Sequence, residues 1–275
     1  MLWTMWEWDT FPKSVPGWDK AMYGIPHYDH VVAYTQQTID ALRSAGPEGF
    51  LPDDKVSVVQ GGIDPTLWYP ITDRRAERVL EKVGERAKKR DTMRFAMVGV
   101  LSSRKNPYTV IRAFNELKEE HGDQFDAELL LKTDFPVLPQ EYDAPGVRVI
   151  RENWSDAELR QFYWSIDCLI NCSWGEGKDL PAMEATLCGV PTIINDTAGH
   201  RGWVHPFMTT LLPTTKINMD PEYVGRFTGA EDIKSAMMDM YKRKPVKFQE
   251  TDNLRQWVEK EGSWDKRVSK FLEEI

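Results

Sequence analysis

Two glutamates, Glu176 and Glu184, lie eight positions apart in the stretch SWGEGKDLPAMEATLCGVP (173–191). An apolar run ends just before this stretch, Pro181 suits the first turn of a short helix, and Gly189 suits its end. A helix N-terminus binds phosphate through free N–H groups, and carboxylates accept hydrogen bonds from sugar hydroxyls. The spacing therefore predicts that the two acids flank one ligand cavity.

The alternative is that both acids are ordinary solvated surface residues, which is the commoner situation for an isolated pair of glutamates. Two features favour a site instead. Glu184 stands among apolar residues in PAMEATLCGVP, where a charge needs a partner. Gly175 and Gly177 flank Glu176 and would let the backbone approach a ligand closely. We therefore take Gly177, Lys178, Asp179 and Leu180 as further candidate ligand contacts.

A second loop, GVLSSRKNP (99–107), joins an apolar run to a helical pattern and carries Arg104 and Lys105. Two cations near a helix N-terminus oppose the helix dipole unless an anion lies with them. Either residue alone is more simply explained as pointing to solvent. Together with the glutamate loop, however, they favour diphosphate binding, with Gly99 at the turn.

The elements that must position these loops follow from alternation. Buried strands are predicted by the apolar runs at 94–100, 127–132, 147–150, 166–172 and 191–196. Several of the segments between these runs have apolar residues at helical spacing. Ser155 and Glu158 form a capping box that opens one helix. The pattern predicts a doubly wound α/β domain, which binds ligands beyond the carboxyl ends of its parallel strands.

The front of the chain shows the same alternation on a smaller scale. The run HVVAYT (30–35), the helical pattern QQTIDALRSA (36–45) and KVSVVQ (55–60) predict a βαβ unit. We expect two lobes, a reduced N-terminal lobe at 1–75 and a second domain at 76–251, with the amphipathic C-terminal helix (252–275) packing on the first.

Composition limits the class of protein. The 275 residues carry a formal charge of −8 at pH 7, which argues against broad nucleic-acid binding. A basic cluster at 85–90 reads as a solvated helix face. Three cysteines without a CxxC pair read as reduced thiols, and no metal site is predicted. Acids at the N-terminus and the lack of a long apolar run predict a cytoplasmic protein without export or a membrane span.

The motif EGKDLPAMEATLCGVP (176–191) resembles the sugar-nucleotide motif EGFGLPxLEAMACGxP of the retaining glycosyltransferases of family four, the glycogen synthase-like group with the GT-B fold. Other stretches follow in the family's order. They are MWEWDTFP (5–12), VVQGGIDPTLWYP (58–70), VGVLSSRKNP (98–107) and SDAELRQFYWSIDCLINCSWGEG (155–177). The resemblance spans about residues 1 to 200 and implies two Rossmann-like lobes.

By that resemblance, Lys105 would meet the donor diphosphate, Glu176 the transferred sugar and Glu184 the ribose hydroxyls. The donor would be a UDP-, GDP- or other nucleotide sugar, with no further cofactor. Two departures stand out. Lys178 and Asp179 replace the usual Phe-Gly, and Val100 replaces an arginine whose charge we expect Arg104 to supply.

The larger departure lies at the front, where about 70 residues precede the expected hinge instead of well over 150. We expect a truncated or compact N-terminal lobe there. Glu7 and Asp9, in a tryptophan-rich stretch, are candidates for the acceptor side, as are Gly62 and His200. The alternative is that the tryptophans, Trp3, Trp6, Trp8 and Trp18, fill a core.

The sequence therefore predicts a metal-independent hexosyl- or pentosyltransferase that moves a sugar from a nucleotide diphosphate to an unidentified acceptor with retention. A nucleotide-sugar-binding or inactive partner protein is the alternative from another class. A glycosyltransferase acting on DNA bases, of viral type, is a second alternative that the acidic charge disfavours.

Overall fold

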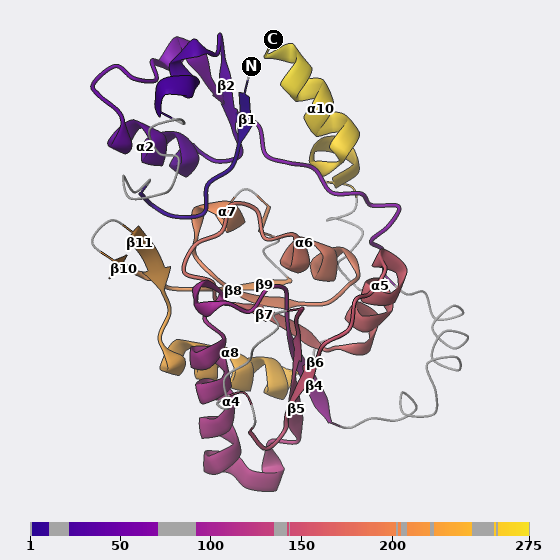
Figure 1. Cartoon of the computed structure of the whole chain (residues 1–275). Coiled ribbons are helices and arrows are strands. Elements are labelled where there is room, and N and C mark those ends of the chain that lie inside the picture. The colour runs from indigo at the N-terminus through magenta and orange to yellow at the C-terminus, as the bar shows by residue number, and fades with distance from the viewer. Residues whose placement is uncertain are drawn as a thin grey trace.

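The chain forms two lobes, one above the other in the view of Figure 1. The C-terminal helix lies beside the lobe that contains the N-terminal residues. The structure is a computed structural model. It describes residues 2–10, 22–70, 92–134, 142, 144–201, 203–204, 208–220, 223–243, 256 and 258–274. The expected domain boundary at 75/76, the basic cluster at 85–90 and Trp18 lie outside these residues.

The N-terminal lobe contains a three-stranded parallel sheet in the order β1 (Leu2–Thr4), β2 (Val31–Ala33), β3 (Val56–Val58). Helix α2 (Gln36–Ala45) connects β2 to β3, as the βαβ pattern predicted. Thr35 caps this helix by accepting a hydrogen bond from the Thr38 N–H. Short helical turns at Ile25–His27 and Asp53–Lys55 complete the described part of the lobe.

The second lobe is built on a six-stranded sheet in which every strand pair is parallel. The order is β6 (Val147–Ile150), β5 (Ala127–Lys132), β4 (Met93–Val98), β7 (Cys168–Asn171), β8 (Thr192–Asn195), β9 (Thr209–Leu212). The α/β fold with parallel sheets expected from the sequence is confirmed.

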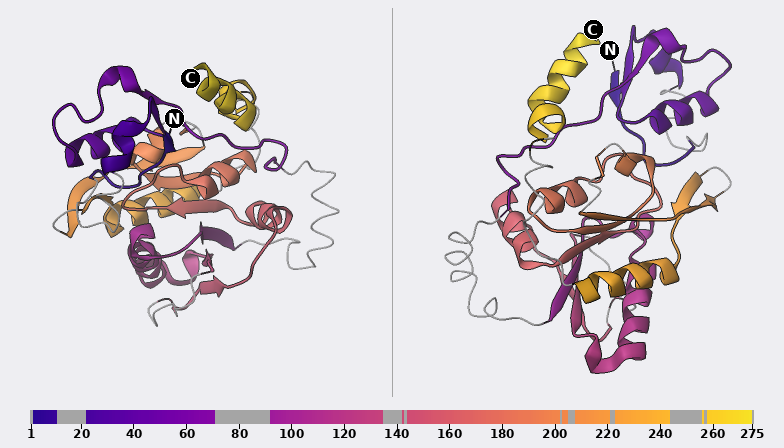
Figure 2. Two further views of the ribbon diagram at one scale, coloured as in Figure 1. Left: turned by 45° about the horizontal axis from the view of Figure 1, so that its top comes forward. Right: turned by 180° about the vertical axis from the view of Figure 1, so that it is seen from behind.

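Helices cover both faces of this sheet (Figure 2). Phe95 and Met97 of β4 point to a core with α4 (Pro107–His121) and α8 (Ala230–Arg243), whereas Ala96 between them points to a core with α5 (Asp156–Ser165) and α6 (Leu180–Leu187). This alternation follows from the two-residue period of a strand. The predicted capping box of α5 is present, with Ser155 and Glu158 bonded reciprocally.

The strand order places a topological switch point between β4 and β7. From β4 the chain moves outward through β5 to β6, and then returns to the other side of β4 to form β7, β8 and β9. Loops that leave the carboxyl ends of β4 and β7 therefore run in opposite directions, and ligands usually bind in the crevice that such a switch point creates. These are the two loops that carry Lys105 and Glu176.

Elements from the last part of the sequence lie at the junction of the lobes. The antiparallel hairpin of β10 (Thr215–Asp220) and β11 (Tyr223–Phe227) had not been predicted. A short π-helix (Val258–Gly262) leads into α10 (Trp264–Glu273), and Ile63 pairs with Ser263 in an isolated bridge. The C-terminal helix thus lies beside the N-terminal lobe, against the segment that leaves it (Figure 1). Within the described residues, no helix is both long and apolar enough to cross a membrane.

Candidate active site

Lys105 and Glu176 meet at the switch point, 71 positions apart in the sequence. The Lys105 ammonium donates to Glu176 Oε1, and the side-chain amide of Asn171, at the end of β7, donates to the same oxygen at 3.3 Å. Glu176 is 5% exposed and Lys105 8% exposed. Because both groups are buried, removal of either one would leave the other as an unpaired charge in the protein interior, which costs free energy.

The loop after β4 has a backbone shape that directs Lys105 inward. Gly99 adopts a φ of +128°, which favours glycine, and a side chain there would face the Lys105 Cε. A helical turn (Ser103–Lys105) then brings the two cations together, and Asn106 enters the left-handed region at φ 54° before α4 begins at Pro107.

Arg104 joins the site from the same turn and links it to the N-terminal lobe. Its Nη1 donates to the Gly175 carbonyl at 2.6 Å and lies 3.5 Å from Glu176 Oε1, while Nη2 lies 3.0 Å from Glu7 Oε1. Val100 is 51% exposed, on the surface. The guanidinium of Arg104 is therefore a second cation beside Glu176, and its substitution for the arginine that Val100 replaces stays a prediction.

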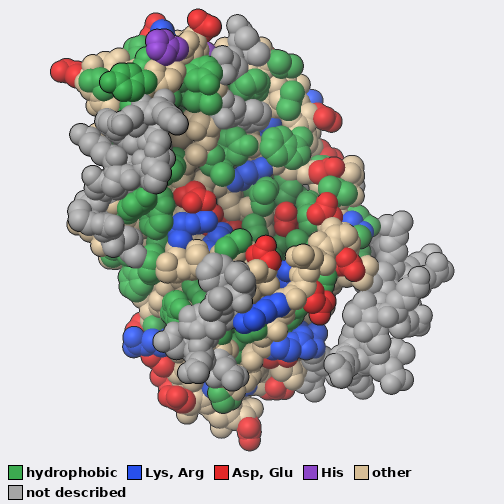
Figure 3. All heavy atoms as spheres, in the orientation of Figure 1, with side chains coloured by type: hydrophobic (Ala, Val, Ile, Leu, Met, Phe, Trp, Pro, Cys, Tyr) green, Lys and Arg blue, Asp and Glu red, His purple; other side chains and the backbone are tan. Residues whose placement is uncertain are grey.

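Glu7 reaches this group from the segment after β1. Burial raises the pKa of its carboxyl, and Glu176 adds to the increase, whereas Arg104 and Lys105 act against it. The space-filling view shows acidic and basic side chains facing each other at the junction of the lobes (Figure 3). One cluster thus brings together four charged groups from three segments, namely Glu7, Arg104, Lys105 and Glu176.

The glycines around Glu176 are required by close backbone approach. A Cβ on Gly175 would collide with the Glu7 carbonyl, and one on Gly177 would collide with the Met5 side chain. From the other side, a Cβ on Gly199 would collide with the backbone of Glu176. The loop is held between the N-terminal segment and α7 (Ala198–Arg201), which explains the Gly-Glu-Gly pattern in physical terms.

Asp179 and His200 form a fully buried pair beneath this loop. Asp179 Oδ2 lies 2.8 Å from His200 Nε2, and His200 Nδ1 lies 2.6 Å from the Asn195 carbonyl. Each ring nitrogen thus lies within hydrogen-bond distance of an oxygen acceptor, and Nδ1 also lies 3.1 Å from the Thr197 hydroxyl. An ionised Asp179 therefore favours protonation of both nitrogens, which makes the ring an imidazolium.

In this pair, the interaction between the two groups favours their charged forms more strongly than burial disfavours them. Burial acts to lower the pKa of His200, but the hydrogen bond and charge of Asp179 raise it overall. Burial likewise acts to raise the pKa of Asp179, and His200 lowers it overall. We had expected Asp179 on the donor and His200 on the acceptor, but both side chains point into the protein interior with no exposed surface.

Lys178 also turns away from the glutamate cluster. Its ammonium donates to the Gly62 carbonyl and lies 4.5 Å from the centre of the Trp264 ring. Burial lowers its pKa to about 8, and Arg267 nearby acts in the same direction. Gly62, expected on the acceptor side, packs instead against the backbone of Trp264. The replacement of the usual Phe by Lys178 therefore joins the loop to the segment between the lobes and to α10.

Glu184 lies one turn inside α6, where the Tyr163 hydroxyl donates to its Oε2 at 2.8 Å. Burial raises the pKa of Glu184 to about 7. Leu180, the first residue of the helix, is 44% exposed. Tyr163 is a functional candidate that could not be predicted from local sequence signals, because its pairing with Glu184 depends on how α5 packs against α6.

The ionisation of Glu184 provides a test near neutral pH. An acid with a pKa of about 7 changes from about nine-tenths ionised at pH 8 to about one-tenth at pH 6. If its carboxylate accepts hydroxyl hydrogens of the nucleotide sugar expected from the sequence, affinity for that ligand should fall about tenfold between these values, measured by calorimetry. The Glu184→Gln variant should show no such dependence, and an equal slope in both proteins would contradict the role.

Asp9 lies apart from Glu7 despite its closeness in sequence. Its carboxylate is 2.8 Å from Arg226 Nε on the hairpin, and its N–H donates to the Val224 carbonyl. Trp8 packs edge-on against Tyr223. This tryptophan therefore holds the N-terminal segment on the hairpin. The described residues include no group of three or more potential metal ligands.

With this geometry established, comparison with known proteins is informative. Residues 92–216 match the family model described as glycosyl transferases group 1. The match begins at β4 and ends in β10, so it includes both loops of the switch point. The group 1 match thus falls on the lobe that carries Lys105 and Glu176.

Curated relatives cover the chain in part. The chain is 26% identical over 225 residues to the alpha-maltose-1-phosphate synthase of Mycolicibacterium smegmatis, which covers 77% of this chain and 54% of the relative. It is 28% identical over 180 residues to the D-inositol 3-phosphate glycosyltransferase of Corynebacterium aurimucosum, covering 62% and 41%. The chain therefore spans about half the length of these relatives.

Solved structures extend the likeness to both lobes. The sucrose-phosphate synthase of Thermosynechococcus elongatus matches with a TM-score of 0.66 and 19% identity, over 92% of this chain and 59% of that one. Anabaena HepE in complex with UDP-glucose matches with a TM-score of 0.67 and 14% identity, over 94% and 67%. The group 1 lobe and the smaller lobe together have the GT-B-like arrangement.

Proposed function

We propose that this protein transfers a sugar from a nucleotide diphosphate sugar to a hydroxylated acceptor. The observation that carries the proposal is the meeting of Lys105, Arg104 and Glu176 at the carboxyl ends of β4 and β7. The group 1 match and both glycosyl-transferring relatives support a glycosyltransferase. The UDP-glucose complex of the HepE neighbour supports a nucleotide sugar as donor.

Charge placement suggests how transfer would be assisted. Negative charge grows on the diphosphate as the bond to the sugar breaks, and groups that contact this charge lower the barrier. Lys105 and Arg104 are cations in the crevice, and α6 begins beside it with its N-terminus. In the proposed reaction these groups bind the leaving diphosphate, and Glu176 accepts hydrogen bonds from the transferred sugar.

Three finer features belong to the proposal. The ribose of the donor lies against Glu184, whose carboxylate would accept its hydroxyl hydrogens. The configuration at the anomeric carbon is retained, as the resemblance to family four implies. Cations of the chain take the place of a metal, so EDTA leaves the transfer rate unchanged.

A thermal-shift panel of nucleotide sugars tests the donor directly. A ligand that binds only the folded protein at a concentration 100 times its Kd stabilises the fold by about 2.7 kcal/mol. We expect one nucleotide sugar to raise the melting temperature of the wild type and to have little effect on Arg104→Ala. The matched control is Arg243→Ala, at the exposed end of α8, which should respond as the wild type does.

The outcome also separates the alternatives. Binding followed by transfer, with the anomeric configuration of the product read by NMR, supports the proposal in full. Binding without transfer to any acceptor supports a nucleotide-sugar-binding protein. A panel in which no nucleotide sugar shifts the melting temperature contradicts the proposed function.

A further inference from the structure

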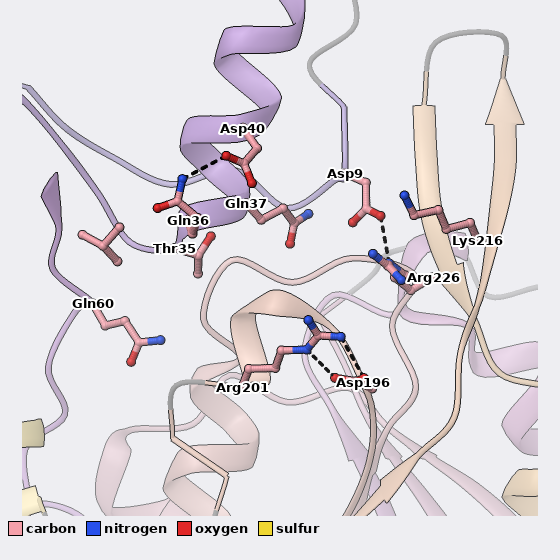
Figure 4. A pocket seen from close by; sticks show the side chains of 11 residues that line it. Asp9, Thr35, Gln36, Gln37, Asp40, Gln60, Asp196, Arg201, Lys216 and Arg226 are labelled. Carbon is pink, nitrogen blue, oxygen red and sulfur yellow. Dashed lines mark hydrogen bonds and ion pairs between the residues drawn. The ribbon is translucent and has the colours of Figure 1, made fainter. Parts of the chain in front are cut away.

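A cavity of about 550 Å³ lies between the lobes, outside the Lys105–Glu176 cluster (Figure 4). Its walls come from the segments that follow β1, β2 and β3, and from α7 and the β10–β11 hairpin. The carboxyl ends of the small parallel sheet therefore face it, as is usual for ligand sites in such sheets. The volume lies within the range of small-molecule pockets.

The wall from the N-terminal lobe is suited to hydroxyl groups. It presents the side-chain amides of Gln36, Gln37 and Gln60 and the carboxylate of Asp40. Asp40 accepts a hydrogen bond from Gln36 at 2.9 Å and is otherwise exposed. Amides both donate and accept hydrogen bonds, and a carboxylate accepts them, which is the combination that polyhydroxylated molecules require.

The opposite wall carries three cations, two of which are already neutralised. Arg201 forms two hydrogen bonds with Asp196, at 2.7 and 2.9 Å, and Arg226 is paired with Asp9. Lys216, on β10, lines the same cavity. Within the described part of the chain, its ammonium has no hydrogen bond or ion pair, so this wall has one uncompensated positive charge.

The cavity borders the proposed transfer site at two points. Asp9, on one wall, follows Glu7 by two residues, and Glu7 contacts Arg104. Arg201, on the floor, follows Gly199 by two residues, and Gly199 packs on the backbone of Glu176. Both walls are therefore joined by short backbone segments to residues that contact Arg104 or the backbone of Glu176, and the inference places the acceptor on this side of the glutamate loop.

We propose that this cavity binds the acceptor, and that the acceptor is a small hydroxylated molecule bearing an anionic group that Lys216 recognises. The inference rests on the proposed function and names the substrate class of the same enzyme. The hydroxyls lie against the glutamines and Asp40, and the anion lies against the hairpin. A phosphate or a carboxylate would satisfy Lys216, because both are anionic acceptors of hydrogen bonds.

The test compares acceptors with the same ring skeleton that differ in whether they carry an anionic group. With the donor found in the thermal-shift panel, transfer is measured to glucose, glucose 6-phosphate and glucuronate, and to inositol and inositol 1-phosphate. At least one anionic member should exceed its neutral partner tenfold or more in kcat/KM. Whether phosphate or carboxylate is preferred separates the two sources of the anion.

Variants then assign the effect to the hairpin. Lys216→Ala should lower kcat/KM for the anionic acceptor at least tenfold by raising KM, should bring the anionic-to-neutral ratio of kcat/KM close to one, and should leave the donor Kd unchanged. Lys242→Ala, an exposed lysine at the end of α8, is the matched control and should change none of these values. Calorimetry of the anionic acceptors with the free protein gives the same comparison without turnover.

Two results would overturn the inference. One is equal use of neutral and anionic members in every pair, and the other is an anionic preference that Lys216→Ala leaves intact. Either would leave the proposed function standing, because the donor would still bind and react. A failure of all nucleotide sugars to bind would instead remove the proposed function, and the inference with it.

Discussion

Lys105→Ala is expected to lower kcat for sugar transfer by about 10²–10³-fold, the loss typical of removing one group that stabilises transition-state charge. The substitution removes the ammonium that contacts Glu176 at the switch point. It also leaves Glu176 buried beside one fewer cation, which weakens the placement of its carboxylate. Initial rates with saturating donor and acceptor measure the effect.

Two further variants show whether the loss comes from the charge. Glu176→Gln keeps the shape of the side chain but removes its charge, and we expect a similar loss of kcat. Lys55→Ala changes an exposed lysine of the small lobe and should keep the wild-type rate. A Lys105→Ala protein that is folded and retains more than a third of wild-type kcat would contradict the assignment.

His200→Ala is expected to lower the free energy of unfolding by about 3–5 kcal/mol, because removing one member of a buried ion pair leaves the other charge unpaired. For a chain of this size, that corresponds to a fall in the melting temperature of roughly 10 °C. The Oδ2 of Asp179 would lose its partner at 2.8 Å, and the buried carboxyl would either stay charged without that partner or take up a proton as its pKa rises.

The controls separate this pair from ion pairs in general. Arg112→Ala removes one partner of an exposed pair on α4, with Glu116, and should leave the melting temperature unchanged. Removing both charges with Asp179→Ala and His200→Ala together should be less damaging than the sum of the two single changes. A His200→Ala protein as stable as the wild type would show that the imidazolium does not hold the loop.

The same pair predicts how stability depends on pH. The pKa of His200 is raised in the folded state, so its contribution is fully present below about pH 6.5 and is lost as pH rises through the folded-state pKa. The pKa of Asp179 is lowered, so its contribution is lost as pH falls below about 3.8. The difference in melting temperature between wild type and His200→Ala should therefore be larger at pH 6 than at pH 9.

The sequence was most informative where local signals agreed with the fold. The run AELLLK (127–132) became β5 with those bounds, and the capping box fixed the start of α5 at Asp156. Alternation of strands with helices restricts a parallel sheet to few topologies. The strand order itself comes from the structure, and Lys105 and Glu176 meet because β4 and β7 are neighbours in that order.

The features that sequence reasoning missed depend on tertiary contacts. Asp179 looked like a ligand contact because it lies in the motif, but its partner His200 comes from α7, 21 positions away. The β10–β11 hairpin escaped notice because TKINMD (215–220) contains only two apolar residues, Ile217 and Met219, which is too short an alternation to indicate a strand. Its role depends on Asp9 and Trp8, which reach it from the other end of the chain.

Lys178 connects parts of the chain that a sugar-binding motif would not ordinarily reach. Its ammonium contacts both the carbonyl of Gly62 and the ring of Trp264. This one side chain therefore connects the glutamate loop to the segment between the lobes and to α10. Truncation of the chain before Trp264 would remove the ring that contacts the Lys178 ammonium. Residues of α10, far from Glu176 in sequence, thereby help to determine how firmly the glutamate loop is held.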